Sequence, residues 1–335
     1  MAEIIDMHVH FGAPCDPASG CYWSETFEKT AAYWFMKLMS GSLFEKLTIA
    51  HIEKKLLDII NDSKQVDKCV LLAMDKVYDE NGNPKENETH LYVPNTYIKT
   101  MSENNTRVLF GASVHPYRTN WEDELEYCIL NGACLCKWIP SSQQIDPANN
   151  KCMPFYQTLA DHNFPLLVHC GPEYAIPTSN NTYKEMNNPK HLRPALNMGV
   201  TVIIAHCSLP YLNMLDIEYQ DDLAEFYKLF EDAQTNNWKL YSDVSALATP
   251  LRSSYIPDVK RKIPHEKLLF GSDYPLPASE LSYKKNKNVF KWLKLFFEAL
   301  FTKNPIDKNY RAIDDMGFSK SVFTNASNLF NAIIR

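Results

Sequence analysis

The 335-residue chain has no long hydrophobic run, no basic block and no low-complexity linker. No apolar stretch approaches the roughly 18 residues that a membrane-spanning helix needs. The N-terminus lacks a basic segment followed by a long apolar core, which argues against secretion. The net charge of −6, without a basic patch, argues against nucleic acid as a partner.

A disulfide framework is also missing, because the nine cysteines are odd in number and scattered along a long chain. The composition, 45% hydrophobic and 22% charged, is that of an ordinary globular protein. We therefore expect a soluble cytoplasmic protein with reduced thiols that acts on a small-molecule substrate.

Eight short apolar runs alternate with helical patterns along the chain, and several of them are continuous Val/Ile/Leu runs typical of buried parallel strands. The expected strands are 4–10, 68–74, 108–114, 133–139, 165–169, 200–206, 239–244 and 268–271. The expected helices are 48–64, 92–103, 121–131, 155–163, 191–198, 221–236, 289–301 and 320–334. Eight such units in one chain of this length predict an α/β fold, a (β/α)₈ TIM barrel, as a single domain over residues 1–335.

A doubly wound sheet is the competing architecture, but the Gly-rich phosphate loop that normally follows its first strand is absent after His10. Instead, a long irregular excursion over residues 11–41 follows that strand and is rich in aromatic residues. This excursion is interpreted either as a lid or pocket wall or as a helical hairpin packed on the barrel.

Polar residues gather where the expected strands end, which is where a barrel builds its chemistry. His8 and His10 are two residues apart, so on a strand both side chains point to one face, as half of a metal site requires. Five of the ten histidines end expected strands. Among the other strand ends, His115 is interpreted as a satisfied turn residue, and Asp75 and Asp243 as caps of the segments that follow.

Four imidazoles and one carboxylate at a single mouth would remain unsatisfied unless a cation lay among them. A divalent metal, Zn²⁺ first and Mn²⁺ or Fe²⁺ as alternatives, suits this set of nitrogen and oxygen ligands. The residues concerned are His8, His10, His169, His206 and Asp273.

The stretches around these residues resemble the motifs of the amidohydrolase superfamily, in particular its amidohydrolase-related branch of TIM-barrel hydrolases and decarboxylases. The four stretches are 6–10, 166–171, 203–207 and 269–275, in the order of that family. The resemblance extends over almost the whole chain and implies a metal-dependent barrel enzyme, commonly a homodimer, without specifying its substrate.

Lys137, at the end of the fourth expected strand, distinguishes two forms of this site. The resemblance implies either a carboxylated Lys137 that bridges two metals, or one metal held by His8, His10, His169 and Asp273, with His206 catalytic. In the two-metal form, His8, His10 and Asp273 hold the first ion, and His169 and His206 hold the second. An unmodified Lys137 that binds a substrate carboxylate, or one paired with Asp273 or Asp75, remains open.

The expected reaction is hydrolysis of a lactone, ester or amide, with Asp273 moving the proton of the attacking water and, in the one-metal form, His206 stabilising the oxyanion. Non-oxidative decarboxylation of an aromatic or enoic acid is the alternative, and a barrel that binds without turnover is a third interpretation. For substrate binding, the sequence indicates Trp138, Arg252 and Tyr274, which follow strand ends. Arg252 is interpreted either as a clamp for a carboxylate or as a surface arginine.

Overall fold

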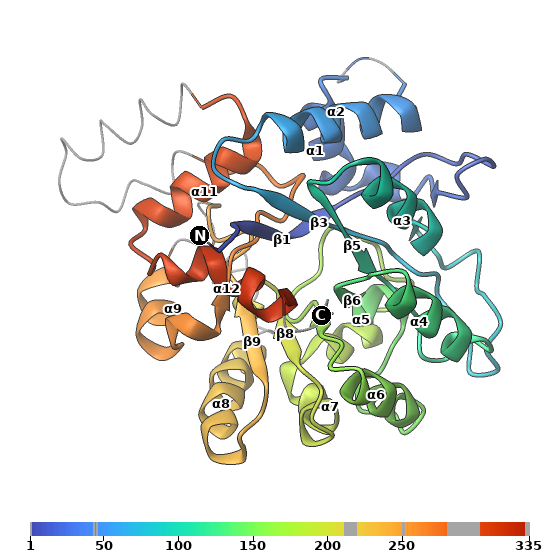
Figure 1. Cartoon of the computed structure of the whole chain (residues 1–335). Coiled ribbons are helices and arrows are strands. Elements are labelled where there is room, and N and C mark those ends of the chain that lie inside the picture. Colours follow the sequence, from blue (N-terminus) through green and yellow to red (C-terminus); the bar gives the residue numbers. More distant parts are fainter. Residues whose placement is uncertain are drawn as a thin grey trace.

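The computed structural model describes residues 2–42, 44, 46–210, 220–249, 252, 254–279 and 302–331. Within them, eight parallel strands form one sheet in the order β1-β3-β5-β6-β7-β8-β9-β10 (Figure 1). The strands are β1 (Ile5–His10), β3 (Lys68–Leu72), β5 (Val108–Ala112), β6 (Leu135–Trp138), β7 (Leu166–Val168), β8 (Val202–Ile204), β9 (Leu240–Asp243) and β10 (Leu268–Leu269). Each lies within a predicted run, which confirms the (β/α)₈ barrel.

The first and last strands meet to bring the sheet close to a complete barrel. The Met7 N–H donates to the Phe270 carbonyl at 3.0 Å, and the Asp273 N–H donates to the His8 carbonyl at 2.9 Å. The His10 N–H donates to the Tyr274 carbonyl at 2.9 Å. The segment after β10 is thereby held beside β1, where His8 and His10 lie.

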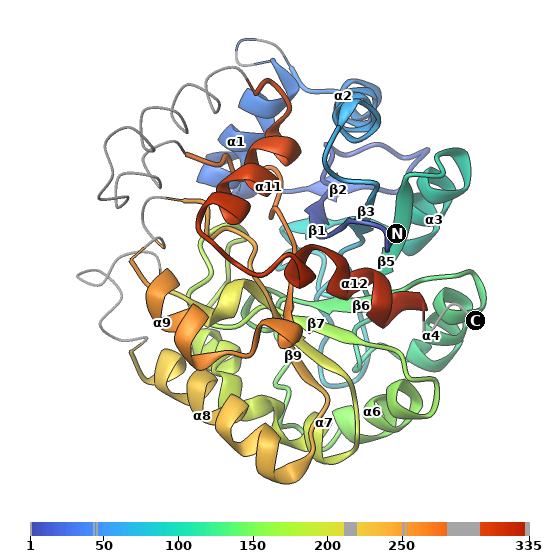
Figure 2. The ribbon, with the colours of Figure 1, turned by 60° about the vertical axis from the view of Figure 1, so that its left-hand side comes forward.

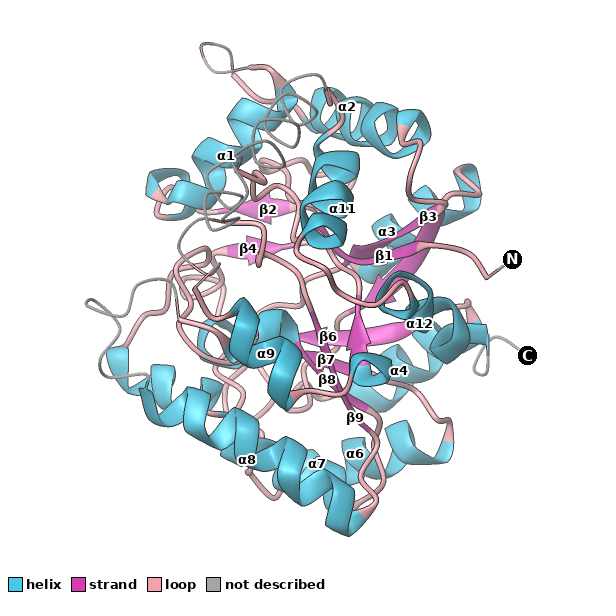
Figure 3. Ribbon diagram, turned by 90° about the vertical axis from the view of Figure 1, so that its left-hand side faces the viewer, coloured by secondary structure: helices cyan, strands magenta, loops and turns pink. Residues whose placement is uncertain are grey.

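The hydrophobic core has an inner and an outer part, because successive side chains of a strand point to opposite faces of the sheet. The inner cluster contains Ile5 and Met7 of β1 and one or more residues of most other strands. Phe330 of α12 (Ser321–Asn331) joins it, and α12 lies near both chain termini (Figure 3). A much larger outer cluster fills the space between the strands and the surrounding helices.

Helices follow most strands, and their ends are close to the predicted ones. They include α2 (Ile49–Asp62), α3 (Asn95–Asn104), α4 (Trp121–Leu130), α5 (Pro140–Gln143), α6 (Cys152–Asp161), α7 (Arg193–Asn197), α8 (Gln220–Asn236), α9 (Ile256–Lys262) and α11 (Pro305–Asp315). The predictions missed α5, α9 and α11, and the predicted helix 289–301 lies outside the described residues. In the part of the chain that is described, no helix combines the length and the hydropathy needed to cross a bilayer.

The aromatic excursion after β1 folds against the rest of the chain through a short antiparallel ribbon that was not predicted. Its strand β2 (Tyr22–Trp23) pairs with β4 (Leu91–Tyr92), and η1 (Phe27–Lys29) and α1 (Ala31–Ser40) follow. Trp23 packs on Phe27 and Tyr33, with ring centroids 5.8 and 5.5 Å apart. The excursion is therefore partly helical and has a core of its own, and α1 lies near α11 and α2 (Figure 2).

Candidate metal centre

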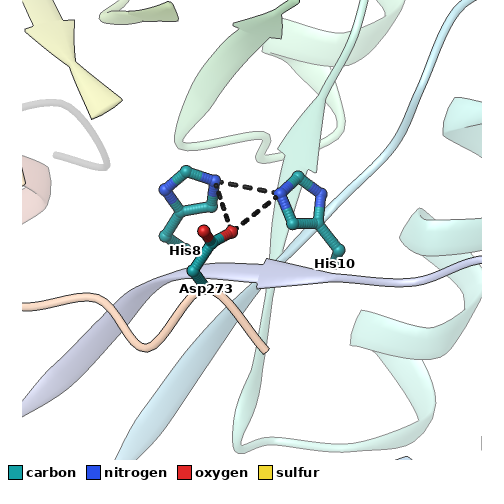
Figure 4. A group of neighbouring side chains, drawn as sticks. All are labelled: His8, His10 and Asp273. Atoms are coloured by element: carbon teal, nitrogen blue, oxygen red, sulfur yellow. Dashed lines mark hydrogen bonds and ion pairs between the residues drawn. The ribbon is translucent and has the colours of Figure 1, made fainter. Parts of the chain in front are cut away.

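Three predicted ligands, His8, His10 and Asp273, converge at the point where β1 meets the segment after β10 (Figure 4). The two Nε2 atoms of His8 and His10 are 3.0 Å apart. The Asp273 Oδ1 atom lies 3.3 Å from Nε2 of His10 and 3.6 Å from Nε2 of His8. Their side chains come from opposite ends of the strand order, so the group exists only because the barrel brings those ends together.

His8 is oriented by a buried carboxylate on the far side of its ring. Its Nδ1 lies 2.8 Å from Oδ2 of Asp243 and 3.2 Å from the Ser245 hydroxyl. An ionised carboxylate only accepts hydrogen bonds, so Nδ1 carries the hydrogen and Nε2 keeps its lone pair. A buried carboxylate behind a ligating histidine is the common second-sphere arrangement of metal sites, where it fixes the tautomer and the ring orientation.

The charge states of these groups suit a cation. Burial lowers the pKa of His8, with the neighbouring Lys137 adding to the effect, so the imidazole is neutral near pH 7. Burial alone would raise the pKa of Asp273, but its contacts with His8 and His10 and the nearby charge of Arg252 outweigh burial and hold that pKa well below its usual range. Neutral imidazoles and an ionised carboxylate are the forms that bind metals.

The spacing and the lone pairs of these ligand atoms suit a metal ion. Ligand atoms on a tetrahedral ion with bonds of 2.0–2.1 Å lie about 3.3 Å apart, close to the separations observed here. The lone pair of His8 Nε2 faces a carboxylate oxygen of Asp273, which is unfavourable unless a cation lies between them. The residues present therefore fit a divalent ion with nitrogen and oxygen ligands.

His169 and His206 form a second pair, separate from the first group. His206 Nε2 lies 3.0 Å from Nδ1 of His169, and burial lowers the pKa of both rings, that of His169 to about 4. His169 follows β7 as predicted. His206 lies beyond the end of β8, in the short helix η4 (Ala205–Ser208), rather than on the strand.

The backbone at His206 adopts a left-handed conformation that few non-glycine residues favour. Its φ and ψ are 39° and 36°, and Cys207 and Ser208 also have positive φ. The His206 N–H donates to Oδ1 of Asp243 at 2.7 Å. This bond supports the strained turn, so one carboxylate holds both the ring of His8 and the backbone of His206.

Lys137 lies inside the barrel between the two groups. Its side chain is 1% exposed, and Nζ lies 3.3 Å from Nε2 of His8. Burial lowers the pKa of the amine. The described ion pairs do not join Lys137 to Asp273 or to Asp75; Asp75 pairs instead with Arg118, at 3.1 Å.

Three residues of the site were not predicted as such. Asp243, interpreted as a cap, is the carboxylate behind His8. Glu173, buried after β7, places Oε2 3.2 Å from Nδ1 of His169. Asp6 accepts the N–H groups of His8 and Ser272 at 3.2 and 2.8 Å and so ties β1 to the Asp273 segment. The sequence could have indicated them, because Asp6 and Glu173 lie within four residues of a predicted ligand and Asp243 ends a strand.

Gly271 allows the Asp273 segment to approach β1 closely. A Cβ atom at position 271 would lie 2.8 Å from Cβ of His8 and 3.2 Å from Cβ of Ser245. Real Cβ atoms essentially never approach another atom as closely as 2.8 Å, so any side chain at position 271 would displace His8.

Two predicted substrate-binding residues belong to the hydrophobic core. Trp138 is fully buried, packs on Phe155 and Tyr156 of α6, and donates from Nε1 to the Val114 carbonyl at 2.8 Å. It faces the helices because the neighbouring Lys137 faces the barrel interior. Tyr274 is 7% exposed and belongs to the outer hydrophobic cluster. A contact of Trp138 or Tyr274 with a substrate stays a prediction.

Arg252 is 1% exposed, so the interpretation as a surface arginine was wrong. Its charge helps to lower the pKa values of His169, His206 and Asp273, which places the guanidinium near the site. His115, by contrast, is a satisfied turn residue as predicted: Nε2 contacts the Gln143 carbonyl at 2.9 Å, and Nδ1 accepts the Tyr117 N–H at 3.1 Å.

The protein is thus a TIM barrel of eight parallel strands with a candidate metal centre at the ends of its strands. The family model described as Amidohydrolase matches residues 5–307, so the chain belongs to the amidohydrolase family. No curated protein matches the sequence.

Solved structures show the same fold at low sequence identity. An uncharacterized TIM-barrel protein from Bordetella bronchiseptica is 13% identical, with a TM-score of 0.54 over 94% of this chain and 99% of that one. A probable 2-pyrone-4,6-dicarboxylic acid hydrolase from Acinetobacter baumannii is 16% identical, with a TM-score of 0.56 over 98% and 99%. The 5-carboxyvanillate decarboxylase from Sphingomonas paucimobilis is 11% identical, with a TM-score of 0.54 over 100% and 99%.

Proposed function

We propose that this protein is a metal-dependent hydrolase of a lactone, ester or amide bond in a small-molecule substrate. The observation that carries the proposal is the convergence of His8, His10 and Asp273, whose ligand atoms all lie within 4.8 Å of one another. Zn²⁺ is the proposed ion, with Mn²⁺ or Fe²⁺ as alternatives. When bound, such an ion lowers the pKa of a coordinated water toward about 7 and polarises a carbonyl group.

The residues of the chain supply the proton transfer and the orientation. Asp273, whose lowered pKa keeps it ionised, accepts the proton of the attacking water and delivers it to the leaving oxygen or nitrogen. His206 faces His169 with one ring nitrogen, while its Nδ1 has no hydrogen-bond partner among the described residues. In the one-ion form of the site, His206 would hydrogen-bond the developing oxyanion, a contact worth about 3 kcal/mol.

Lys137 determines whether the site takes one ion or two. Burial lowers the pKa of the Lys137 amine and so favours its neutral form, and a neutral amine can add carbon dioxide to form a carbamate with loss of a proton. We propose this carboxylated form, in which Lys137 would be a further ligand, while His8, His10 and Asp273 would hold a first ion and His169 and His206 a second. With an unmodified Lys137, a single ion is held by His8, His10, His169 and Asp273.

Decarboxylation of an aromatic or enoic acid is the second candidate, and the buried guanidinium of Arg252 supports it. A positive charge near Asp273 and His206 suits a substrate that presents a carboxylate to the site. A hydrolase acting on a carboxylate-bearing lactone would use the same contact. Carbon dioxide release from hydroxybenzoates, measured beside hydrolysis of aryl lactones and esters, separates the two reactions.

The test of the hydrolytic proposal is Asp273→Asn. We expect this variant to retain part of the bound metal, since the histidines remain, and to lose at least about 100-fold in kcat. Hydrolysis at a near-normal rate by the Asn variant would remove Asp273 from its proposed role.

A further inference from the structure

Glu173 is a buried carboxylate that the proposed reaction does not use. Its side chain is 5% exposed, although it belongs to the connection that follows β7. One oxygen, Oε1, accepts the backbone N–H groups of Ala175 and Ile176, the latter at 2.9 Å. These bonds fix the side chain and leave the other oxygen, Oε2, directed at His169.

Oε2 approaches His169 on the side of the ring where a ligand atom is available. Nε2 of His169 lies 3.2 Å from the Pro172 carbonyl, which can only accept, so this nitrogen carries the hydrogen of the neutral ring. Nδ1 then keeps the lone pair, and this is the atom 3.2 Å from Oε2 of Glu173. Glu173 is thus not the usual acceptor behind a ligating histidine, as Asp243 is for His8.

The same Nδ1 atom also faces His206, whose Nε2 is 3.0 Å away. A hydrogen on Nε2 of His206 satisfies Nδ1 of His169, but it leaves the Glu173 oxygen beside an atom that has no hydrogen to donate. The Nδ1 atom of His206 has no partner among the described residues either. A cation at this side of His169 removes the conflict, since carboxylate oxygen and imidazole nitrogen are both good ligands for zinc, manganese and iron.

From this geometry we propose that Glu173 is a further metal ligand, which contributes a carboxylate to the ion held by His169. The inference rests on the proposed metal-dependent function and adds to it. A further carboxylate gives the metal centre a more negative charge, which strengthens its hold on a divalent ion.

The experiment measures zinc affinity and stoichiometry of the full-length protein by equilibrium dialysis at buffered free zinc, followed by elemental analysis. Glu173→Gln keeps an oxygen for the two backbone N–H groups and replaces the ligating oxygen by an amide nitrogen that cannot ligate. Glu185→Gln is the matched control, because Glu185 carries the same charge but is mainly exposed and pairs with Lys190.

We expect Glu173→Gln to weaken zinc binding at one class of site at least about tenfold, and Glu185→Gln to leave it unchanged. In protein loaded with Co²⁺, the visible absorption bands should change in Glu173→Gln and not in the control. Unchanged zinc affinity and unchanged cobalt bands would overturn the inference and identify Glu173 as an ion-pair partner of a protonated His169.

Circular dichroism of the metal-free proteins verifies the fold. Should Glu173→Gln fail to fold, Glu173→Asp keeps the charge, shortens the reach and is expected to show the same weakening. A wild-type protein that binds no zinc, manganese or iron would instead contradict the proposed function. Wild-type binding together with an unaffected Glu173→Gln contradicts only this inference.

Discussion

Nδ1 of His8 lies 2.8 Å from Oδ2 of Asp243, and this contact determines which nitrogen of His8 faces the metal centre. The carboxylate is fully buried and also accepts the Ser245 hydroxyl. Water therefore does not compete with His8 for this carboxylate, and the fold fixes the tautomer of His8.

Asp243→Asn is expected to weaken metal binding by about 10- to 100-fold. The amide can turn its NH₂ group toward Nδ1 of His8, which moves the hydrogen of the ring to Nε2 and removes the lone pair from the site. The measurement is zinc affinity by competition with a chromophoric chelator. Ser245→Ala, which removes a neighbouring hydroxyl and leaves the carboxylate in place, is the control, and equal affinities of the two variants would contradict the assigned role.

Lys137→Met tests the number of ions. A methionine fills most of the volume of the buried lysine, which limits packing changes, but it cannot form a carbamate. With a carboxylated lysine, elemental analysis is expected to give two ions per chain in the wild type and one or none in the variant. One ion in both proteins would place Lys137 outside the ligand set and assign His206 to catalysis alone.

Arg252→Gln is expected to raise KM for carboxylate-bearing substrates by at least about tenfold, because a charge-assisted contact is lost. A neutral ester of the same ring system should be affected much less. The comparison of kcat/KM for the acid and its neutral analogue in both proteins is the measurement. Equal losses for both substrates would indicate that Arg252 stabilises the site rather than the substrate.

The stability of the fold should decrease as the pH falls below the range where unfolded histidine titrates. Burial lowers the pKa of His115 to about 3 from an ordinary value of 6.5, so the unfolded chain binds the proton first. The stabilisation is complete above pH 6.5 and is lost as the pH falls from there toward 3. At pH 5 this one group lowers the free energy of unfolding by about 2 kcal/mol relative to pH 8.

Urea unfolding of the metal-free protein at several pH values measures this dependence. His115→Gln removes the titrating ring, so the difference between pH 8 and pH 5 should be smaller in that variant than in the wild type. The same pH dependence in both proteins would mean that other buried histidines account for it.

The strands could be predicted because parallel strands buried on both faces have a composition that loops and exposed helices do not share. His8 and His10 could be predicted because a spacing of two has one consequence on a strand, and Asp273 because it ends the last apolar run. Arg252 was identified as a candidate, but its burial depends on how the chain packs around it.

What could not be predicted has physical causes that are equally specific. Lys137 and Trp138 are adjacent on β6 and cannot both face the barrel interior, so the prediction for Lys137 already placed Trp138 on the opposite face of the strand. Asp243 and Glu173 follow strands, where carboxylates commonly cap turns, and only the three-dimensional contacts distinguish a cap from a partner of histidine. The β2–β4 ribbon joins short segments that are distant in sequence and carry no pattern of their own.

The candidate metal centre lies where β1 meets the segment after β10, so it is complete only when the whole barrel has folded. His8 and His10 belong to the first strand to be synthesised, whereas Asp273 follows the last, so a partly synthesised or C-terminally truncated chain has only half of the centre. If only the closed barrel binds the proposed ion tightly, that ion would add to the stability of the barrel by mass action, about 2.7 kcal/mol at a free concentration 100 times Kd. Metal supply in the cell would then govern how much of this protein persists, as well as how much of it is active.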